Sequence, residues 1–259
     1  MEFNKIKQLR HFEMKNKTKV FHPIKTRFVL LTVLSFLVCS IVFADGDSRR
    51  ATQAEKDFNK SILNTFAKAV PPGPAGWEKT EDSTEIKELQ IVYSAENRPL
   101  KVEYRIAWED SKQIRDADVK FQEELIKLAQ KPGFKGDGVD ELQEKMTPHD
   151  VKVRIDISAN LTSQGISEKV NPAPAIAGGL VYQSQGQYRS GWNEGSTYVF
   201  LGKGWKMNNS AGTYVDFKPE KWLTSSTVVQ NIVVRVQADP KRAAQIIQKI
   251  DWETLKNLI

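Results

Sequence analysis

Two segments of this sequence alternate strictly between apolar and polar side chains, and this alternation constrains the fold more than any other feature. The segments are residues 100–108 (LKVEYRIAW) and 151–157 (VKVRIDI). Successive side chains of a β-strand point to opposite faces of a sheet, so each segment predicts a strand with one buried face. A buried face needs a second layer of structure over it. We therefore expect a sheet that is covered on at least one side.

Weaker patterns predict further strands. Residues 89–93 alternate, and a turn-forming stretch at 96–99 follows them, so we expect an antiparallel hairpin with 100–108. Residues 160–195 show little periodicity, apart from one short strand. The strands between 197 and 217 are separated by glycine-containing turns, which predicts a meander. The additional strands are expected at 180–185, 197–201, 205–207, 214–217 and 228–238.

Helices are predicted where apolar residues recur at a spacing of three or four. Within residues 51–70, Phe58, Ile62 and Phe66 form one apolar stripe, so this segment is expected to be an amphipathic N-terminal helix that ends before Pro71. Three more helical segments are expected: 112–130 with Val119, Ile126, Leu128 and Ala129 facing inward, a short turn within 139–146, and 239–250 with Asp239 as its cap.

These elements define the expected fold class. Strands and helices do not alternate regularly along the chain, and consecutive strands are joined by short turns, which favours antiparallel pairing. We predict an α+β fold: a mostly antiparallel sheet of about six to eight strands with helices packed on one face. No linker composition divides residues 45–259, which are expected to form a single domain.

An export signal is expected before this domain. Residues 28–44 (FVLLTVLSFLVCSIVFA) are apolar and uncharged, and lysine and arginine residues precede them. A basic segment, an apolar run and a small residue at its end make a secretory signal peptide. We predict that residues 1–44 are a signal peptide cleaved after Ala44, with Met14 as an alternative start. The run is near the lower limit of roughly 17–25 residues for a membrane span, so an uncleaved anchor is the alternative.

The net charge of +6 belongs entirely to this leader. The chain has 38 Lys+Arg and 32 Asp+Glu, and residues 1–44 contain six Lys, two Arg and two Glu. Residues 45–259 therefore carry equal numbers of basic and acidic side chains. Proteins that bind nucleic acids usually have an excess of Lys and Arg that neutralises phosphates. We expect no nucleic-acid partner, and contact with a membrane only through the leader if it is not cleaved.

Cysteine usage indicates the compartment. Cys39 is the only cysteine and lies in the leader, so the cleaved domain has no disulfide, thiol nucleophile or thiolate metal ligand. Lipid attachment at Cys39 is a third fate for the leader, but the bulky Val38 precedes it. Exported eukaryotic domains usually contain disulfides. Their absence favours a bacterial envelope protein that is periplasmic or secreted.

Motifs that would identify an enzyme are missing from the sequence. His149 is the only histidine after residue 44, and no Gly-x-Ser-x-Gly motif accompanies it. The acidic residues of 133–141 lack the spacing of a calcium-binding loop. Glycines at 202–204 separate strands instead of opening a helix, as a phosphate-binding loop would require. We therefore predict no catalytic residue, no metal site and no cofactor.

A cluster of aromatic and amide side chains is the best candidate binding site. Aromatic faces beside hydrogen-bond donors are a common way to build a surface for a glycan or a peptide. The alternative is that these aromatic residues fill the core. The predicted ligand-binding residues are Tyr182, Tyr188, Arg189, Trp192 and Trp205.

These observations lead to one expected function and two alternatives. We expect an exported bacterial envelope protein that binds a macromolecule or a small ligand without catalysis, with an envelope protein, a peptide or a glycan as partner. The first alternative is a hydrolase of envelope material that uses a pair of carboxylates. The second is a structural subunit that docks through its helix at 51–70.

Overall fold

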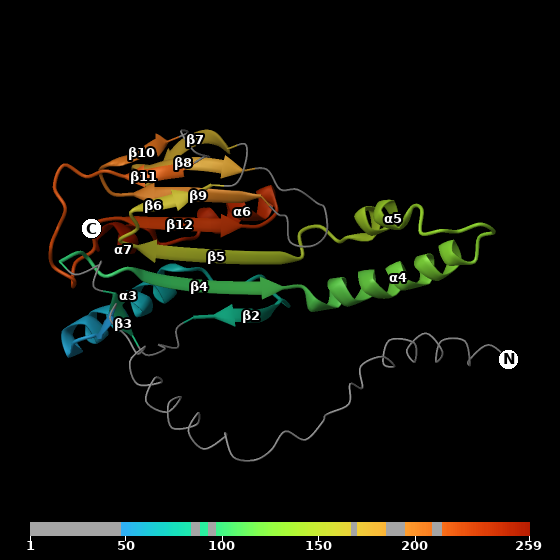
Figure 1. Cartoon of the computed structure of the whole chain (residues 1–259), viewed down its shortest axis with the longest axis horizontal. Helices are drawn as coiled ribbons and strands as arrows, with labels where there is room; N and C mark the ends of the chain where they lie inside the picture. The colour runs from blue at the N-terminus through green and yellow to red at the C-terminus, as the bar shows by residue number, and fades with distance from the viewer. Residues whose placement is uncertain (1–47, 84–88, 93–96, 167–169, 185–194, 209–213) are drawn as a thin grey trace, which may run out of the picture. The chain divides into compact units, whose positions relative to one another are not determined.

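The computed structural model describes residues 48–83, 89–92, 97–166, 170–184, 195–208 and 214–259, and these residues belong to one compact unit. The predicted signal peptide, residues 1–44, lies outside these ranges. The unit is built on a seven-stranded sheet in which all neighbouring strands are antiparallel (Figure 1). In spatial order its strands are β2 (Glu78–Asp82), β4 (Val102–Glu109), β5 (Lys152–Ala159), β12 (Ile232–Gln237), β9 (Ser196–Leu201), β8 (Gly179–Ser184) and β7 (Val170–Ile176).

The two strictly alternating segments form β4 and β5, which pair along their whole length from Val102–Ala159 to Glu109–Lys152. Their apolar side chains face the same side of the sheet. Val153, Ile155 and Ile157 have no exposed surface, whereas the residues between them are partly exposed. The predicted α+β fold with a mostly antiparallel sheet is confirmed.

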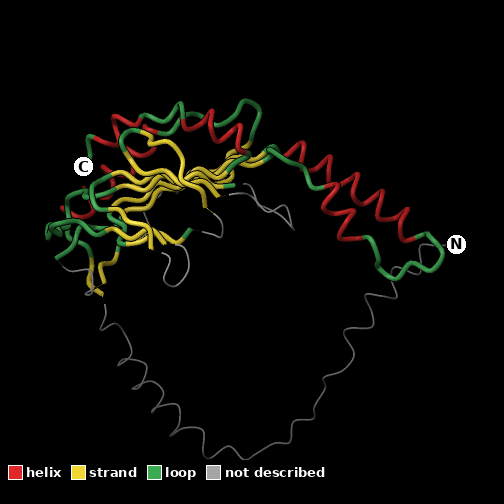
Figure 2. The backbone as a smooth tube through the Cα atoms, turned by 90° about the horizontal axis from the view of Figure 1, so that it is seen from above, coloured by secondary structure: helices red, strands yellow, loops and turns green. Residues whose placement is uncertain are grey.

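Helices α3 (Gln53–Ala69), α6 (Pro240–Ile247) and α7 (Trp252–Lys256) contribute to the main core on one side of this sheet (Figure 2). Helix α3 starts with a capping box: the Thr52 hydroxyl accepts from the backbone of Glu55, and the Glu55 carboxylate accepts from the backbone of Thr52. Ile62, Leu63 and Phe66 of α3 are buried against the sheet. The apolar stripe that a docking helix would need therefore lies inside this domain.

A small three-stranded sheet covers part of the opposite face. Its strands are β10 (Trp205–Asn208), β11 (Tyr214–Phe217) and β6 (Ser163–Gly165), and its apolar side chains pack on Tyr198, Phe200 and Val233 of the large sheet. The expected meander is therefore wrong, because β9 stays in the large sheet while β10 and β11 belong to the small one. Gly204, with φ of +119°, lies at this change of sheet, where a Cβ would be 2.9 Å from the Lys218 backbone.

The predicted hairpin between residues 89–93 and 100–108 is also wrong. Strand β3 (Gln90–Val92) pairs with β1 (Ser48–Arg50) in a separate two-stranded sheet, and β4 pairs with β2 and β5 instead. Alternation identifies a strand, but its partner depends on residues far away in the sequence. Strands β1, β2, β6 and β7 were not expected. Strand β7 contains Pro172 and Pro174, which cannot donate ladder hydrogen bonds and are tolerated at its edge position.

Candidate functional site

A helical hairpin leaves the sheet between two neighbouring strands. Helices α4 (Ser111–Ala129) and α5 (Val139–Met146) connect β4 to β5, and they extend beyond the end of the sheet (Figures 1 and 2). We call α4, α5 and the residues that join them the arm. Neither helix of the arm has a buried residue. The arm thus contributes little to the core of its own domain.

The covered side of α4 differs from the side expected from its sequence. Ile114, Ala117 and Phe121 are the half-buried side chains that line the space between the two helices, whereas Val119 and Ile126 are 59% and 57% exposed. The prediction that Val119, Ile126 and Ala129 face inward is wrong, whereas Leu128 of the same predicted set is half-buried. The cause is that α5 packs on the other side of α4, a choice that the spacing of apolar residues does not determine.

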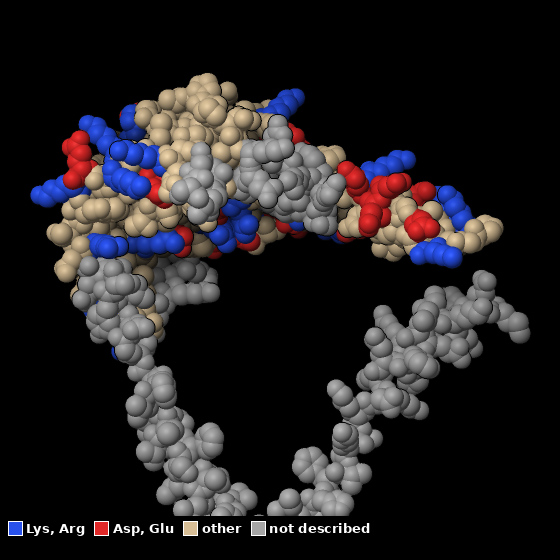
Figure 3. Space-filling model, turned by 45° about the horizontal axis from the view of Figure 1, so that its top comes forward, with Lys and Arg blue, Asp and Glu red and all other residues tan. Residues whose placement is uncertain are grey.

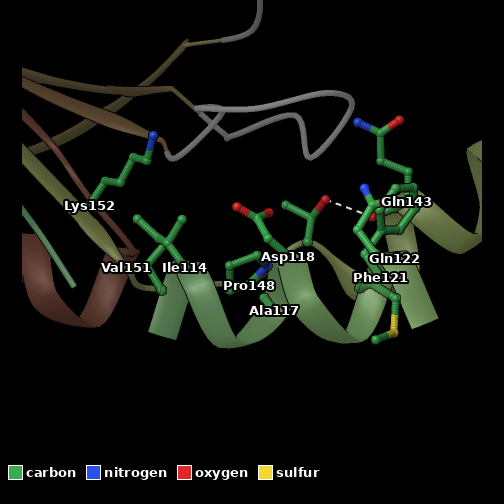
Figure 4. Close-up of a pocket in the computed structure, with 11 residues that line it drawn as sticks. Ile114, Ala117, Asp118, Phe121, Gln122, Gln143, Pro148, Val151 and Lys152 are labelled. Carbon is green, nitrogen blue, oxygen red and sulfur yellow. Dashed lines mark hydrogen bonds between the residues drawn. The ribbon is translucent and has the colours of Figure 1, made fainter. Parts of the chain in front are cut away.

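A groove of about 500 Å³ lies where the arm meets the sheet (Figure 4). Its apolar lining consists of Ile114, Ala117, Phe121, Met146, Pro148 and Val151. Asp118, Gln122 and Gln143 of the arm and Lys152 of β5 add polar groups to this lining, and the close-up shows them pointing to the same side. A groove with an apolar lining and a few polar groups is suited to an amphipathic occupant.

The base of the arm is held by several polar contacts. The backbone N–H of Asp110 donates to the carbonyl of Val151 at 2.8 Å, which closes the base like a hairpin. The Asp110 carboxylate caps α4 by accepting from the N–H of Gln113. Next to it, Arg242 of α6 makes a two-pronged ion pair with Asp150 and lies over the ring of Trp77 at 4.5 Å. The arm is therefore fixed to the domain at both of its ends.

Replacing Arg242 with alanine is expected to loosen this base and to lower the free energy of unfolding by about 1–2 kcal/mol, because a half-buried ion pair and a cation–π contact are lost. Amide hydrogen exchange should become faster at Asp110, whose N–H donates to the carbonyl of Val151. Urea denaturation and exchange measured by mass spectrometry would test this. Lys256→Ala, which removes an exposed pair with Glu253, is the control, with an expected change within about 0.5 kcal/mol. Equal effects of the two variants would contradict the assigned role of Arg242.

The structure describes two of the five predicted ligand-binding residues. Tyr182 is half-buried on β8, with its ring 6.0 Å from that of Phe200. Trp205 is buried in the small-sheet cluster, and its indole N–H donates to the carbonyl of Leu201 at 3.0 Å. Tyr188, Arg189 and Trp192 lie outside the described residues. The predicted aromatic site thus stays a prediction, and Trp205 itself is a core residue.

The carboxyl groups of the described residues include three with resolved pKa shifts. Hydrogen bonds from Arg49, Lys127 and Thr254 lower the pKa of Glu55, Glu124 and Asp251, respectively. A lowered pKa keeps a carboxylate ionised, whereas a general acid needs a raised pKa. His149 is exposed in the loop before β5.

No group of three or more His, Cys, Asp or Glu side chains in the described ranges is arranged to hold a metal ion. Among the helices that the structure describes, none combines the length and the apolar character needed to cross a membrane.

Comparison with models of known protein families, with curated proteins and with solved structures gives no match to this chain.

Proposed function

We propose that this chain is an exported protein of the bacterial envelope that acts by binding, and that its arm is the contact surface for a helix of a partner protein. One observation carries this proposal. The arm is a helical hairpin with exposed apolar side chains, and neither of its helices has a residue that is buried against the rest of the domain. Export rests on the predicted leader at residues 1–44.

The energetics of the arm favour a partner. Fixing the backbone of a residue costs roughly 1–2 kcal/mol, and burial of apolar surface usually offsets this cost. Isolated helices shorter than about 12–15 residues are marginal in water, and α5 has 8 residues. A third helix packed on the arm would supply the missing burial. This is the ordinary composition of a small helical bundle.

The arrangement of side chains on α4 indicates where that helix would lie. Asp118, Gln122 and Ile126 are four residues apart, so they form one row from the groove to the exposed side of the helix. Val119 stands seven residues before Ile126 and therefore faces the same direction. A partner helix along this row would cover the groove and both exposed apolar residues. Acidic and basic side chains are interleaved over the arm and would pair with charges at the edges of such a helix (Figure 3).

Exchanging both exposed apolar residues tests the proposal. The variant Val119→Ser/Ile126→Ser is expected to fold normally and to bind its partner at least about tenfold more weakly, because burying each of these side chains is worth roughly 1.5–3 kcal/mol. The partner would first be identified in the native host by photo-crosslinking from positions 119 and 126, with exposed Lys249 as the control position. Affinity would then be measured with the purified pair.

A second variant removes the arm. Residues 111–150 would be replaced by Asn-Gly, which suits a tight turn between the antiparallel neighbours β4 and β5. This shortened chain is expected to fold and to lose the partner entirely. Crosslinks that arise equally from position 249, or full affinity of the shortened chain, would refute the proposal.

A further inference from the structure

A second cleft lies on the main body, away from the arm. It has a volume of about 490 Å³, which is within the range of roughly 300–1,000 Å³ typical of small-ligand sites. We call it the Trp222 cleft. Its walls include Arg49 and Glu55 near the start of α3, together with residues from 97–101, 160–163 and 222–231. These segments are far apart in the sequence and meet only in the folded chain.

Hydrogen bonds between these segments hold the cleft in shape. The side chain of Asn160 donates to the carbonyls of Leu100 and Val228, each at 2.8 Å, and accepts from the N–H of Gln230 at 2.8 Å. The N–H of Leu100 donates to the carbonyl of Ser226 at 3.0 Å. Walls that are fixed before a ligand arrives reduce the entropy lost on binding.

Trp222 lines this cleft, and much of its aromatic ring is exposed. It is 44% exposed, and its ring packs edge-on against buried Phe217 with the ring centroids 5.6 Å apart. The Gln230 side chain donates to the carbonyl of Lys221 at 2.6 Å and accepts from the N–H of Leu223 at 3.3 Å. Hydrogen bonds to the residues before and after Trp222 thus fix this turn, although the Trp222 indole contributes little to the core.

Among the residues that the structure describes, one basic side chain of the cleft has no acidic partner. Arg49 pairs with Glu55 at 2.9 Å, and Lys101 pairs with Glu103 at 2.8 Å. Arg98 is exposed, and it makes no ion pair with any residue that the structure describes. The guanidinium of Arg98 is therefore available for an anionic group, and a carboxylate matches its two-pronged geometry.

We propose that the Trp222 cleft binds an acidic saccharide. The apolar C–H face of a sugar ring would lie on Trp222, and the carboxylate of that sugar would accept hydrogen bonds from Arg98. The exposed hydroxyls of Thr162 and Ser163 line the same cleft and suit a ligand with many hydroxyl groups. This site is separate from the arm and does not depend on the function proposed above.

Calorimetric titration with the trimer of galacturonic acid, compared with the neutral trimer of galactose, tests this site. The acidic trimer is expected to bind in the range of about 0.1–1 mM, and the neutral one about tenfold more weakly. Trp222→Ala and Arg98→Gln should each weaken binding of the acidic trimer about tenfold. Tyr214→Ala and Arg115→Gln remove an exposed aromatic ring and an exposed guanidinium outside the cleft, and should leave the affinity unchanged.

Several results would overturn the proposal. These are no heat of binding at about 10 mM trimer, equal binding of the neutral trimer, or equal losses in the control variants. Tighter binding of hexa-aspartate through Trp222 and Arg98 would instead assign the cleft to acidic peptides. Circular dichroism would verify that each variant is folded. The chain without its arm should bind the acidic trimer normally, so failure of one proposal would be distinguishable from failure of the other.

Discussion

Replacing Glu55 with alanine is expected to lower the free energy of unfolding by about 3 kcal/mol, since breaking a buried ion pair by removing one partner typically costs 3–5 kcal/mol. Glu55 is 2% exposed at the start of α3, and its two oxygens accept from the two terminal nitrogens of Arg49, each at 2.9 Å. It also accepts from the backbone N–H of Thr52 at 2.8 Å. Removing this carboxylate therefore leaves several donors without an acceptor. Urea denaturation at neutral pH would measure the loss.

The same carboxylate should make stability depend on pH. Hydrogen bonds from Arg49 hold the pKa of Glu55 far below the value of about 4.3 that it has in an unfolded chain. The folded state therefore binds this proton less readily than the unfolded state, so the stabilisation is fully present above pH 4–5 and decreases as the pH falls further. Glu55→Gln cannot titrate, and its unfolding free energy should fall less between about pH 5 and pH 2.5 than that of the wild type.

Glu103→Ala provides the matched control. Glu103 pairs with Lys101, but its side chain is 63% exposed, so its removal should change stability by no more than about 0.5 kcal/mol. If Glu103→Ala and Glu55→Ala destabilised the protein equally, burial would not be the source of the Glu55 effect. A pH profile of Glu55→Gln that runs parallel to that of the wild type would likewise contradict the role given to this pair.

Replacing Phe200 with alanine is expected to cost about 3–5 kcal/mol, the usual range for a fully buried phenylalanine. Phe200 has no exposed surface, and its ring lies 5.0 Å from that of Trp205 and 6.0 Å from that of Tyr182. It thus joins the small sheet to the large one. The variant should also expose Trp205, which a red shift of tryptophan fluorescence in the folded state would report.

Leu180→Ala is the control for this second prediction. Leu180 pairs with Phe200 across β8 and β9 and is an apolar residue on the same face, but it is 44% exposed. Its truncation should cost about 1 kcal/mol or less. A similar cost for both variants would mean that the aromatic cluster does not hold the two sheets together.

A sequence pattern can predict a candidate site only when the residues of that site are close together in the sequence. The aromatic cluster around Tyr182 was visible because its residues are close in sequence. The Trp222 cleft was not, since Arg98, Asn160 and Trp222 come from three distant segments and no spacing connects them. The two helices of the arm were predicted, but their projection from the end of the sheet was not. That projection depends on β4 and β5 being direct neighbours in the sheet.

The sequence by itself determined the local structure: strands from the alternation at 100–108 and 151–157, the buried stripe of α3 around Phe66, and the start of α6 at Asp239. These features depend on the direction of side chains and on backbone donors a few residues apart. The tertiary structure alone decided that β3 pairs with β1, that β7 forms an edge of the sheet despite its prolines, and that Val119 stays exposed while Phe121 lines the groove. Each of these features depends on contacts between segments that are far apart in the sequence. The energies of such contacts cannot be inferred from the residues of one segment alone.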